Sequence, residues 1–303
     1  MSGAALELRS LRKAFAGHVA VDGLSLSVRA GSVFGLLGPN GAGKTTTLRM
    51  VMDILRPDAG EIEILGRPAD GSARDRIGYM PEERGLYPRM RLEEQLLFLA
   101  SLKGVPRAAA ARALPAWLER LGLADWRGRR VSELSKGMQQ KAQLLGTLLH
   151  DPELLILDEP MSGLDPVAAD DVRRVLMQLA RQGRTIVLSS HQMDTVERIC
   201  DAIGLISHGE LILAGAVAEV KQRFGRNLVA LAFEGDGGFL ATLPGVVALR
   251  DRGRHTEIQL APDADTQLLL HAAAARLKLR RFEIVEPSLH DIFVEQVRTH
   301  ATR

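Results

Sequence analysis

Over residues 1–225 the apolar positions switch repeatedly between the two-residue period of strands and the longer period of helices. The strand-like segments are Leu6–Arg12, Val21–Val28, Ser32–Leu37, Gly60–Ile64, Leu154–Leu157, Thr185–Ser189 and a hairpin of Ala202–Ser207 with Glu210–Leu213. The helix-like segments are Lys44–Ile54, Leu92–Leu121, Val167–Arg181 and Met193–Ile199. Strands that alternate with helices predict an α/β fold, and the continuous apolar run Leu154–Leu157 is typical of a strand buried on both faces of a parallel sheet.

The pattern changes near Gly225, where we place a domain boundary between residues 1–225 and 226–303. The later segment has strand-like stretches at Asn227–Phe233, Val246–Arg250, Thr256–Leu260 and Arg281–Val285, and a helical one at Gln267–Leu277. A last helix is predicted to start at Ser288, because Asp291 follows three residues later as in a capping box. These elements predict a small α+β domain.

Composition narrows the class of protein. Hydrophobic residues make up 46% and charged residues 25% of the 303, which is ordinary for a globular chain. The net charge of +2 is too balanced to predict a nucleic-acid partner from charge alone. A single cysteine, Cys200, excludes an internal disulfide framework and favours a reducing compartment, and we expect its side chain to be buried and inert. No apolar run approaches the ~18 residues of a membrane span, and the N-terminus has no secretory signal pattern.

The strongest local motif is Gly38-Pro39-Asn40-Gly41-Ala42-Gly43-Lys44-Thr45, which fits the phosphate-loop pattern G-x-x-x-x-G-K-[ST]. It follows a predicted strand and opens a predicted helix. Its glycines let the backbone wrap around an anion, and the helix N-terminus favours phosphate. We expect Lys44 to contact the β- and γ-phosphates and Thr45 to offer its hydroxyl to Mg²⁺. The alternative is a glycine-rich turn that only caps a helix.

Two adjacent carboxylates, Asp158 and Glu159, follow the apolar run Leu154–Leu157. After a phosphate loop, such a strand end predicts a catalytic role. Asp158 is expected to help hold Mg²⁺, and Glu159 to orient or deprotonate the attacking water. Taken alone, an Asp-Glu pair at a strand end is more often a solvated turn.

A third segment of interest is Leu134-Ser135-Lys136-Gly137-Met138-Gln139-Gln140. Its serine, Ser135, lies 23 residues before Asp158. Here the sequence resembles the ATP-binding-cassette (ABC) ATPases of ABC transporters, whose signature loop usually reads L-S-G-G-Q. The resemblance covers about residues 6–225 and brings in further family motifs. These are the adenine-stacking aromatic at Phe15, the Q-loop at Ile77-Gly78-Tyr79-Met80-Pro81-Glu82, the D-loop at Ser162-Gly163-Leu164-Asp165 and the switch histidine at His191.

The resemblance implies a phosphate-loop cassette with a mixed sheet core and a helical subdomain, followed by the small α+β domain. It implies ATP hydrolysis with Mg²⁺. Catalytic roles would belong to Glu159, His191 and Glu82, and metal contacts to Thr45, Asp158 and Glu82. The implied nucleotide contacts are Phe15, Gly38, Pro39, Asn40, Gly41, Ala42, Gly43, Lys44, Thr45, Thr46, Ser135, Gly137 and Asp165.

Two residues depart from the usual motifs: Lys136 replaces a glycine of the signature loop, and Glu82 replaces the glutamine of the Q-loop. Ser135 and Gly137 keep the positions that the family uses toward the γ-phosphate. The run Pro81–Tyr87 and the tail segment Glu286–Phe293 are similar to those of exporter ATPases of the sodium- and drug-efflux type.

In such a family two cassettes enclose two ATP molecules, so a homodimer is expected, together with a separate membrane-spanning permease. The expected location is the cytoplasmic face of the membrane, with no nucleic acid bound. A cassette ATPase that acts on DNA or ribosomes is the alternative. Only 91 residues separate Lys44 from Ser135, with no sustained heptad between them, and the chain has one phosphate loop. A small phosphate-loop kinase would have no use for the other motifs.

Overall fold

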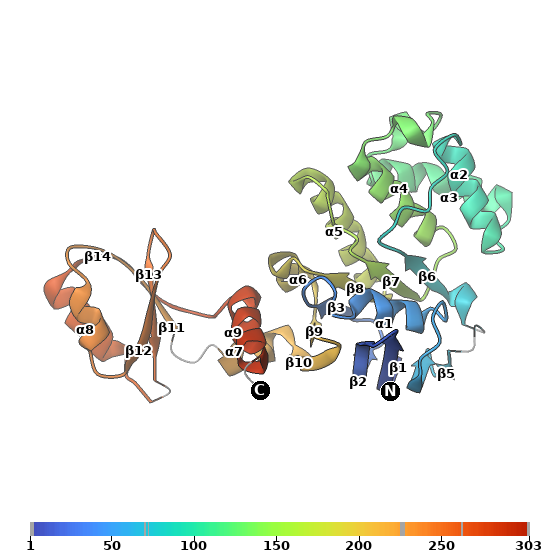
Figure 1. Cartoon of the computed structure of the whole chain (residues 1–303). Coiled ribbons are helices and arrows are strands. Elements are labelled where there is room, and N and C mark those ends of the chain that lie inside the picture. The colour runs from blue at the N-terminus through green and yellow to red at the C-terminus, as the bar shows by residue number, and fades with distance from the viewer. Residues whose placement is uncertain (1–2, 70, 72, 225–227, 262, 302–303) are drawn as a thin grey trace. The chain divides into compact units, whose positions relative to one another are not determined.

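The computed structural model describes residues 3–69, 71, 73–224, 228–261 and 263–301 (Figure 1). They form two compact units, Met1–Gly215 and Ala216–Arg303. The boundary predicted near Gly225 lies outside the described residues. The structure assigns helix α7 (Val217–Phe224) to the second unit. Its side chains Val217 and Val220 are buried, and the helix packs against α9 (Leu289–Ala301).

The first unit is built on a six-stranded sheet in the order β10-β9-β3-β8-β7-β6. Its strands are β3 (Val33–Leu37), β6 (Ile77–Met80), β7 (Leu154–Asp158), β8 (Thr185–Ser190), β9 (Ala202–Ser207) and β10 (Glu210–Ala216). The neighbours from β9 to β6 run parallel. Every residue of β3, β7 and β8 is buried, which confirms the predicted strands covered on both faces.

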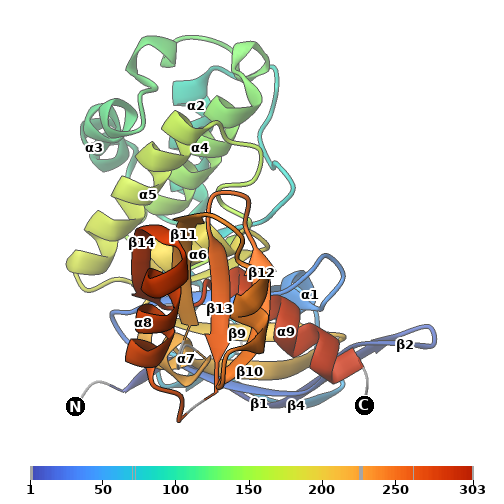
Figure 2. The same ribbon diagram turned by 90° about the vertical axis from the view of Figure 1, so that its left-hand side faces the viewer.

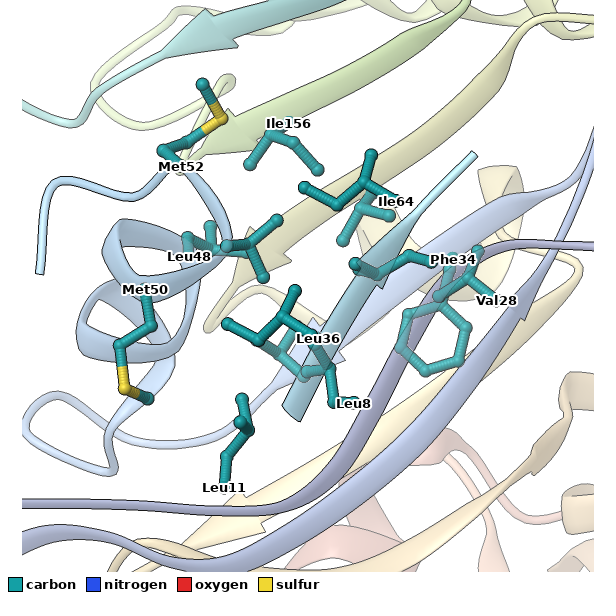
Figure 3. Close-up of a cluster of buried hydrophobic side chains, with 14 of the residues drawn as sticks. Leu8, Leu11, Val28, Phe34, Leu36, Leu48, Met50, Met52, Ile64 and Ile156 are labelled. Atoms are coloured by element: carbon teal, nitrogen blue, oxygen red, sulfur yellow. The ribbon is translucent and has the colours of Figure 1, made fainter. Parts of the chain in front are cut away.

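A second, antiparallel sheet has the order β2-β1-β4-β5. Its strands are β1 (Ala4–Phe15), β2 (His18–Arg29), β4 (Ala59–Ile64) and the short β5 (Arg67–Pro68). Figure 3 shows side chains from this sheet, from β3 and β7 and from helix α1 gathered in one hydrophobic cluster. Burial of this apolar surface fixes helix α1 (Lys44–Val51) between the two sheets. The phosphate-loop segment leads directly into this helix.

Helices complete the first unit. They are α1 (Lys44–Val51), α2 (Leu92–Leu102), α3 (Arg107–Arg120), α4 (Lys136–Leu148), α5 (Pro166–Arg181) and α6 (Met193–Ile199). Short 3-10 turns lie at Arg74–Arg76, Ala124–Trp126 and Val131–Glu133. Helices α2, α3 and α4 pack on one another as the expected helical subdomain, and the predicted helix Leu92–Leu121 is in fact two helices, with Pro106 at the N-cap of the second.

The second unit contains an antiparallel sheet in the order β12-β13-β11-β14 (Figure 2). Its elements are β11 (Leu228–Glu234), β12 (Val246–Asp251), β13 (Thr256–Leu260), α8 (Thr266–Arg276), β14 (Lys278–Val285) and α9 (Leu289–Ala301), with a 3-10 turn at Gly238–Thr242. One sheet face and α8 share a core that includes Val229, Leu231 and Ala273. The Ser288 hydroxyl accepts the Asp291 N–H at 3.1 Å, as the predicted helix start requires.

None of the described helices is long and apolar enough to cross a membrane. The Cys200 side chain is buried, as predicted, and burial raises the pKa of its thiol.

Candidate functional site

The segment between β3 and α1 forms a tight loop that only glycine can build at two positions. Gly38 and Gly43 have φ values of 155° and 108°, a region that other residues rarely adopt. A Cβ atom on Gly38 would lie 2.3 Å from the Ile206 carbonyl oxygen, and one on Gly43 would lie 2.4 Å from that of Ala20. The loop therefore packs directly against neighbouring backbone, and its shape is fixed before any ligand arrives.

Lys44 begins helix α1 and is buried inside this loop. Its Nζ donates hydrogen bonds to the carbonyl oxygens of Gly38 at 2.7 Å and Pro39 at 3.1 Å, and lies 3.9 Å from Glu159 Oε1. Burial lowers the pKa of the ammonium, and the nearby carboxylates oppose that shift. A buried cation at a helix N-terminus favours an anionic ligand such as phosphate.

Asp158 ends strand β7 and is fully buried. Its Oδ1 accepts the Ser189 hydroxyl at 2.5 Å, whereas Oδ2 has no hydrogen-bond partner among the described residues. A buried carboxylate oxygen without a partner is costly unless a cation or donor joins it. Within the described part of the chain no three His, Cys, Asp or Glu side chains could hold a metal by themselves. Asp158 therefore fits a Mg²⁺ ion whose other ligands come from phosphate, water and a hydroxyl such as that of Thr45.

Glu159 follows directly and has φ of 50°, a strained conformation for a residue with a side chain. Its N–H donates to the Ser189 hydroxyl at 2.9 Å, which helps to hold this conformation. Its Oε1 lies 2.9 Å from His191 Nδ1, on the strand-to-helix connection after β8. The carboxylate thus sits between the Lys44 ammonium and the His191 ring.

These groups border a cavity of about 530 Å³. Its lining residues are Phe15, His18, Ala20, Asn40, Gly41, Ala42, Gly43, Lys44, Thr45, Thr46, Glu82 and Glu159. The structure therefore brings together the predicted aromatic, most of the phosphate loop, Glu82 of the Q-loop and Glu159. Gly38, Pro39 and His191 contact lining residues, and Asp158 is buried next to Glu159.

Ser135, Gly137 and Asp165 do not belong to the set of described residues that line this cavity. Ser135 is exposed, and its hydroxyl accepts the Met138 N–H at 3.2 Å as the N-cap of α4. The Asp165 carboxylate accepts the N–H groups of Val167 and Ala168 at the start of α5. In one chain, these two side chains act as helix caps.

Sequence reasoning missed several residues that shape the site. His18 and Ala20 line the cavity. The Ser189 hydroxyl donates to the Asp158 carboxylate and accepts the Glu159 N–H. The amide of Gln143 donates to the carbonyl oxygens of Pro81 at 2.8 Å and Glu83 at 3.2 Å, and so holds the backbone on both sides of Glu82. Ser189 pairs with Asp158 across the parallel strands β7 and β8. The sequence could have indicated Ser189 only if the neighbourhood of these two strands had been known.

The comparisons with known proteins agree on one family. The ABC transporter family model matches residues 21–162, and the model of the ATP-binding protein DrrA1-3-like, C-terminal domain matches residues 215–297. The ABC transporter ATP-binding protein YhaQ of Bacillus subtilis is 41% identical over 96% of this chain and 98% of its own length.

Two more matches have assigned roles or structures. The Nod factor export ATP-binding protein I of Burkholderia orbicola is 38% identical over 85% of this chain and 84% of its own. A solved ATP-binding subunit of an ABC transporter is 32% identical and superimposes with a TM-score of 0.68, over 73% of this chain and 93% of that chain.

Proposed function

Because the chain belongs to the ATP-binding subunits of ABC exporters and hydrolyses ATP for transport, we propose that Lys44, Glu159 and His191 form its hydrolytic centre. The observation that carries this proposal is the position of the Glu159 carboxylate, 3.9 Å from Lys44 Nζ and 2.9 Å from His191 Nδ1, at the edge of the cavity behind the phosphate loop.

Nucleotide binding starts from the loop. Its backbone N–H groups and the Lys44 ammonium provide positive charge for the β- and γ-phosphates. On binding, Lys44 exchanges its two carbonyl partners for phosphate oxygens, whose negative charge offsets the effect of the burial that lowers the pKa of its ammonium. Phe15 lines the same cavity and offers its ring to the adenine base.

The metal contacts belong to the side chains of Asp158 and Thr45, with Glu82 facing the same cavity. When bound, Mg²⁺ neutralises phosphate charge and orients the terminal phosphate for attack. The Oδ2 atom of Asp158, to which no residue that the structure describes is hydrogen-bonded, is the oxygen available to the ion, and the Ser189 hydroxyl keeps the other oxygen in place.

Hydrolysis needs a base beside the terminal phosphate. Glu159 is the carboxylate in reach of Lys44, and therefore of the phosphate that Lys44 binds. It accepts a proton from the attacking water, and His191 holds the carboxylate and lies next to the γ-phosphate position. The left-handed backbone of Glu159 aims its side chain along this edge of the cavity.

The divided site supports a dimer. Ser135 and Gly137 match the γ-phosphate contacts of the family but lie outside the cavity of their own chain. A second copy would bring them to the nucleotide. We therefore propose a homodimer that works with a separate membrane-spanning permease on the cytoplasmic face of the membrane, with export cargo selected by that permease.

The test is Glu159→Gln, which keeps the size of the side chain and removes the base. We expect turnover to fall by ~10²–10⁴, while ATP binding by calorimetry persists and the chain becomes a stable dimer in ATP and Mg²⁺. Glu83→Gln is the matched control, because Glu83 is exposed and does not line the cavity. Near-normal hydrolysis by the Glu159 variant would exclude Glu159 as the base.

A further inference from the structure

Strand β14 (Lys278–Val285) is the edge of the C-terminal sheet. It pairs with β11 on one side, and the described residues supply no backbone partner on its other side. In Figure 2 the strands follow one another as β14, β11, β13 and β12. A free edge of eight residues presents N–H and C=O groups that can pair with another strand.

The register of β14 with β11 shows on which face of the sheet each β14 side chain lies. Phe282 and Ile284 stand opposite the core residues Leu231 and Val229, so they lie on the core face of the sheet. Ile284 is nevertheless 61% exposed. Arg281 and Glu283 lie on the opposite face, with side chains 47% and 54% exposed.

We propose that β14 pairs antiparallel with β14 of a second copy of this chain, with the two-fold axis at Phe282, to make one continuous sheet. In this register Arg281 of each copy stands directly opposite Glu283 of the other, which gives two cross-strand ion pairs on one face. On the core face Phe282 meets Phe282. Each Ile284 becomes a diagonal neighbour of the other copy's Phe282 and stands next to that copy's Arg280, where the pairing of β14 with β11 is irregular.

Neighbouring registers are disfavoured by the same charges. An axis at Arg281 would place two arginines face to face, and an axis at Glu283 would place two glutamates face to face. Charged residues on an edge strand usually prevent pairing. Here they favour the register centred on Phe282 and oppose the two adjacent ones, which is the reason to choose a second copy as the partner.

The Arg281 guanidinium in the single chain bonds to Glu283 two residues along the same strand. That pair is exposed and contributes little to the stability of the chain. It keeps both side chains on the outer face and leaves them free to exchange partners when a second strand arrives. The contact does not involve the nucleotide cavity, so we expect it without ATP, and its failure would leave the proposed hydrolytic centre untouched.

The test uses full-length chain without nucleotide, at high micromolar concentration, in sedimentation velocity. The wild type is expected to show a weak dimer, because a strand-edge contact buries a small area. Arg281→Glu and Glu283→Arg should each weaken the dimer by roughly tenfold or more, since every attractive pair becomes repulsive. Arg254→Glu, an exposed position in the turn between β12 and β13, is the matched control and should not change it.

The decisive step mixes the two single variants. In the mixed dimer each acidic position meets a basic one, so association should return to about the wild-type level, although neither chain keeps its own Arg281–Glu283 pair. Thermal melting of each variant verifies that the chains are folded. A wild type that stays monomeric, or a mixture that stays as weak as its components, would overturn the proposal.

Discussion

At the scale of single residues, the end of β1 that carries Phe15 is held by the carboxylate of Asp58, which precedes β4. Asp58 accepts hydrogen bonds from Lys13 Nζ and from the Ala14 N–H, each at 2.8 Å. The Lys13 ammonium lies 5.6 Å from the centre of the Phe15 ring and is not a lining group of the cavity. The hydrogen bond from Lys13 lowers the pKa of Asp58, so this carboxylate stays charged at neutral pH.

Asp58→Asn should therefore weaken the hold on the end of β1. We expect the KM for ATP to rise several-fold, because Phe15 is less well placed, while kcat changes little. Asp53→Asn is the matched control, since Asp53 pairs with Arg74 and does not line the cavity.

Inorganic tripolyphosphate has no adenine ring, so its affinity should be unchanged in the Asp58 variant. If Phe15→Ala raises the KM but Asp58→Asn does not, Asp58 has no part in positioning the ring.

At the scale of elements, the ends of the parallel strands β7 and β8 assemble the acidic part of the site. Their register places Ser189 beside Asp158. The one hydroxyl donates to Asp158 and accepts from the N–H of Glu159, and both contacts are buried. The serine thereby fixes the Asp158 carboxylate, whose other oxygen is the proposed metal ligand, together with the unusual backbone angle of the proposed base.

Ser189→Ala leaves both buried groups without a partner. Each such loss costs ~1–3 kcal/mol, so we expect urea unfolding to show a decrease of about 2–6 kcal/mol in the free energy of unfolding. The kcat should also fall, because Glu159 loses the contact that supports its left-handed conformation.

The neighbouring Ser190→Ala provides a comparison for that experiment. The Ser190 hydroxyl accepts only the Gln192 N–H among the described contacts. A Ser189 variant with unchanged kcat would show that the strand end keeps its geometry without the hydroxyl.

At the scale of the whole molecule, one chain holds half of each proposed site. Lys44 lines the cavity, whereas Ser135 is an exposed helix cap outside it. Two chains with lesions in different halves should complement each other, because a mixed dimer has one intact site.

Lys44→Ala should lose ATP affinity, since the buried cation has no substitute. Ser135→Arg should bind ATP as a monomer but fail to hydrolyse it, because its bulk acts only when a second chain closes over the nucleotide. Mixing the two should restore part of the ATPase activity. Wild-type activity strictly proportional to concentration, with no dimer of the Glu159→Gln variant in ATP, would refute the shared site.

The sequence alone determined the features whose chemistry is local in the chain. Gly38 and Gly43 have positive backbone φ angles within a few residues of the lysine, and the motif predicted this loop from local sequence. The close contacts that also require glycine there, with the carbonyl oxygens of Ile206 and Ala20, come from distant segments. The apolar runs of β7 and β8 identified strands buried on both faces. The order of motifs along residues 6–225 was enough to place the chain in its family, which the matches then confirmed.

Only the tertiary structure decided the contacts between segments distant in sequence. Asp58 reaches Lys13 across 45 residues, and Ser189 reaches Asp158 across 31, because strand pairing and not local pattern makes them neighbours. Short elements such as β6 carry too few residues for a clear period. Helix α7 became part of the C-terminal unit because its buried face packs there, and the free edge of β14 exists only once the order of the strands is known.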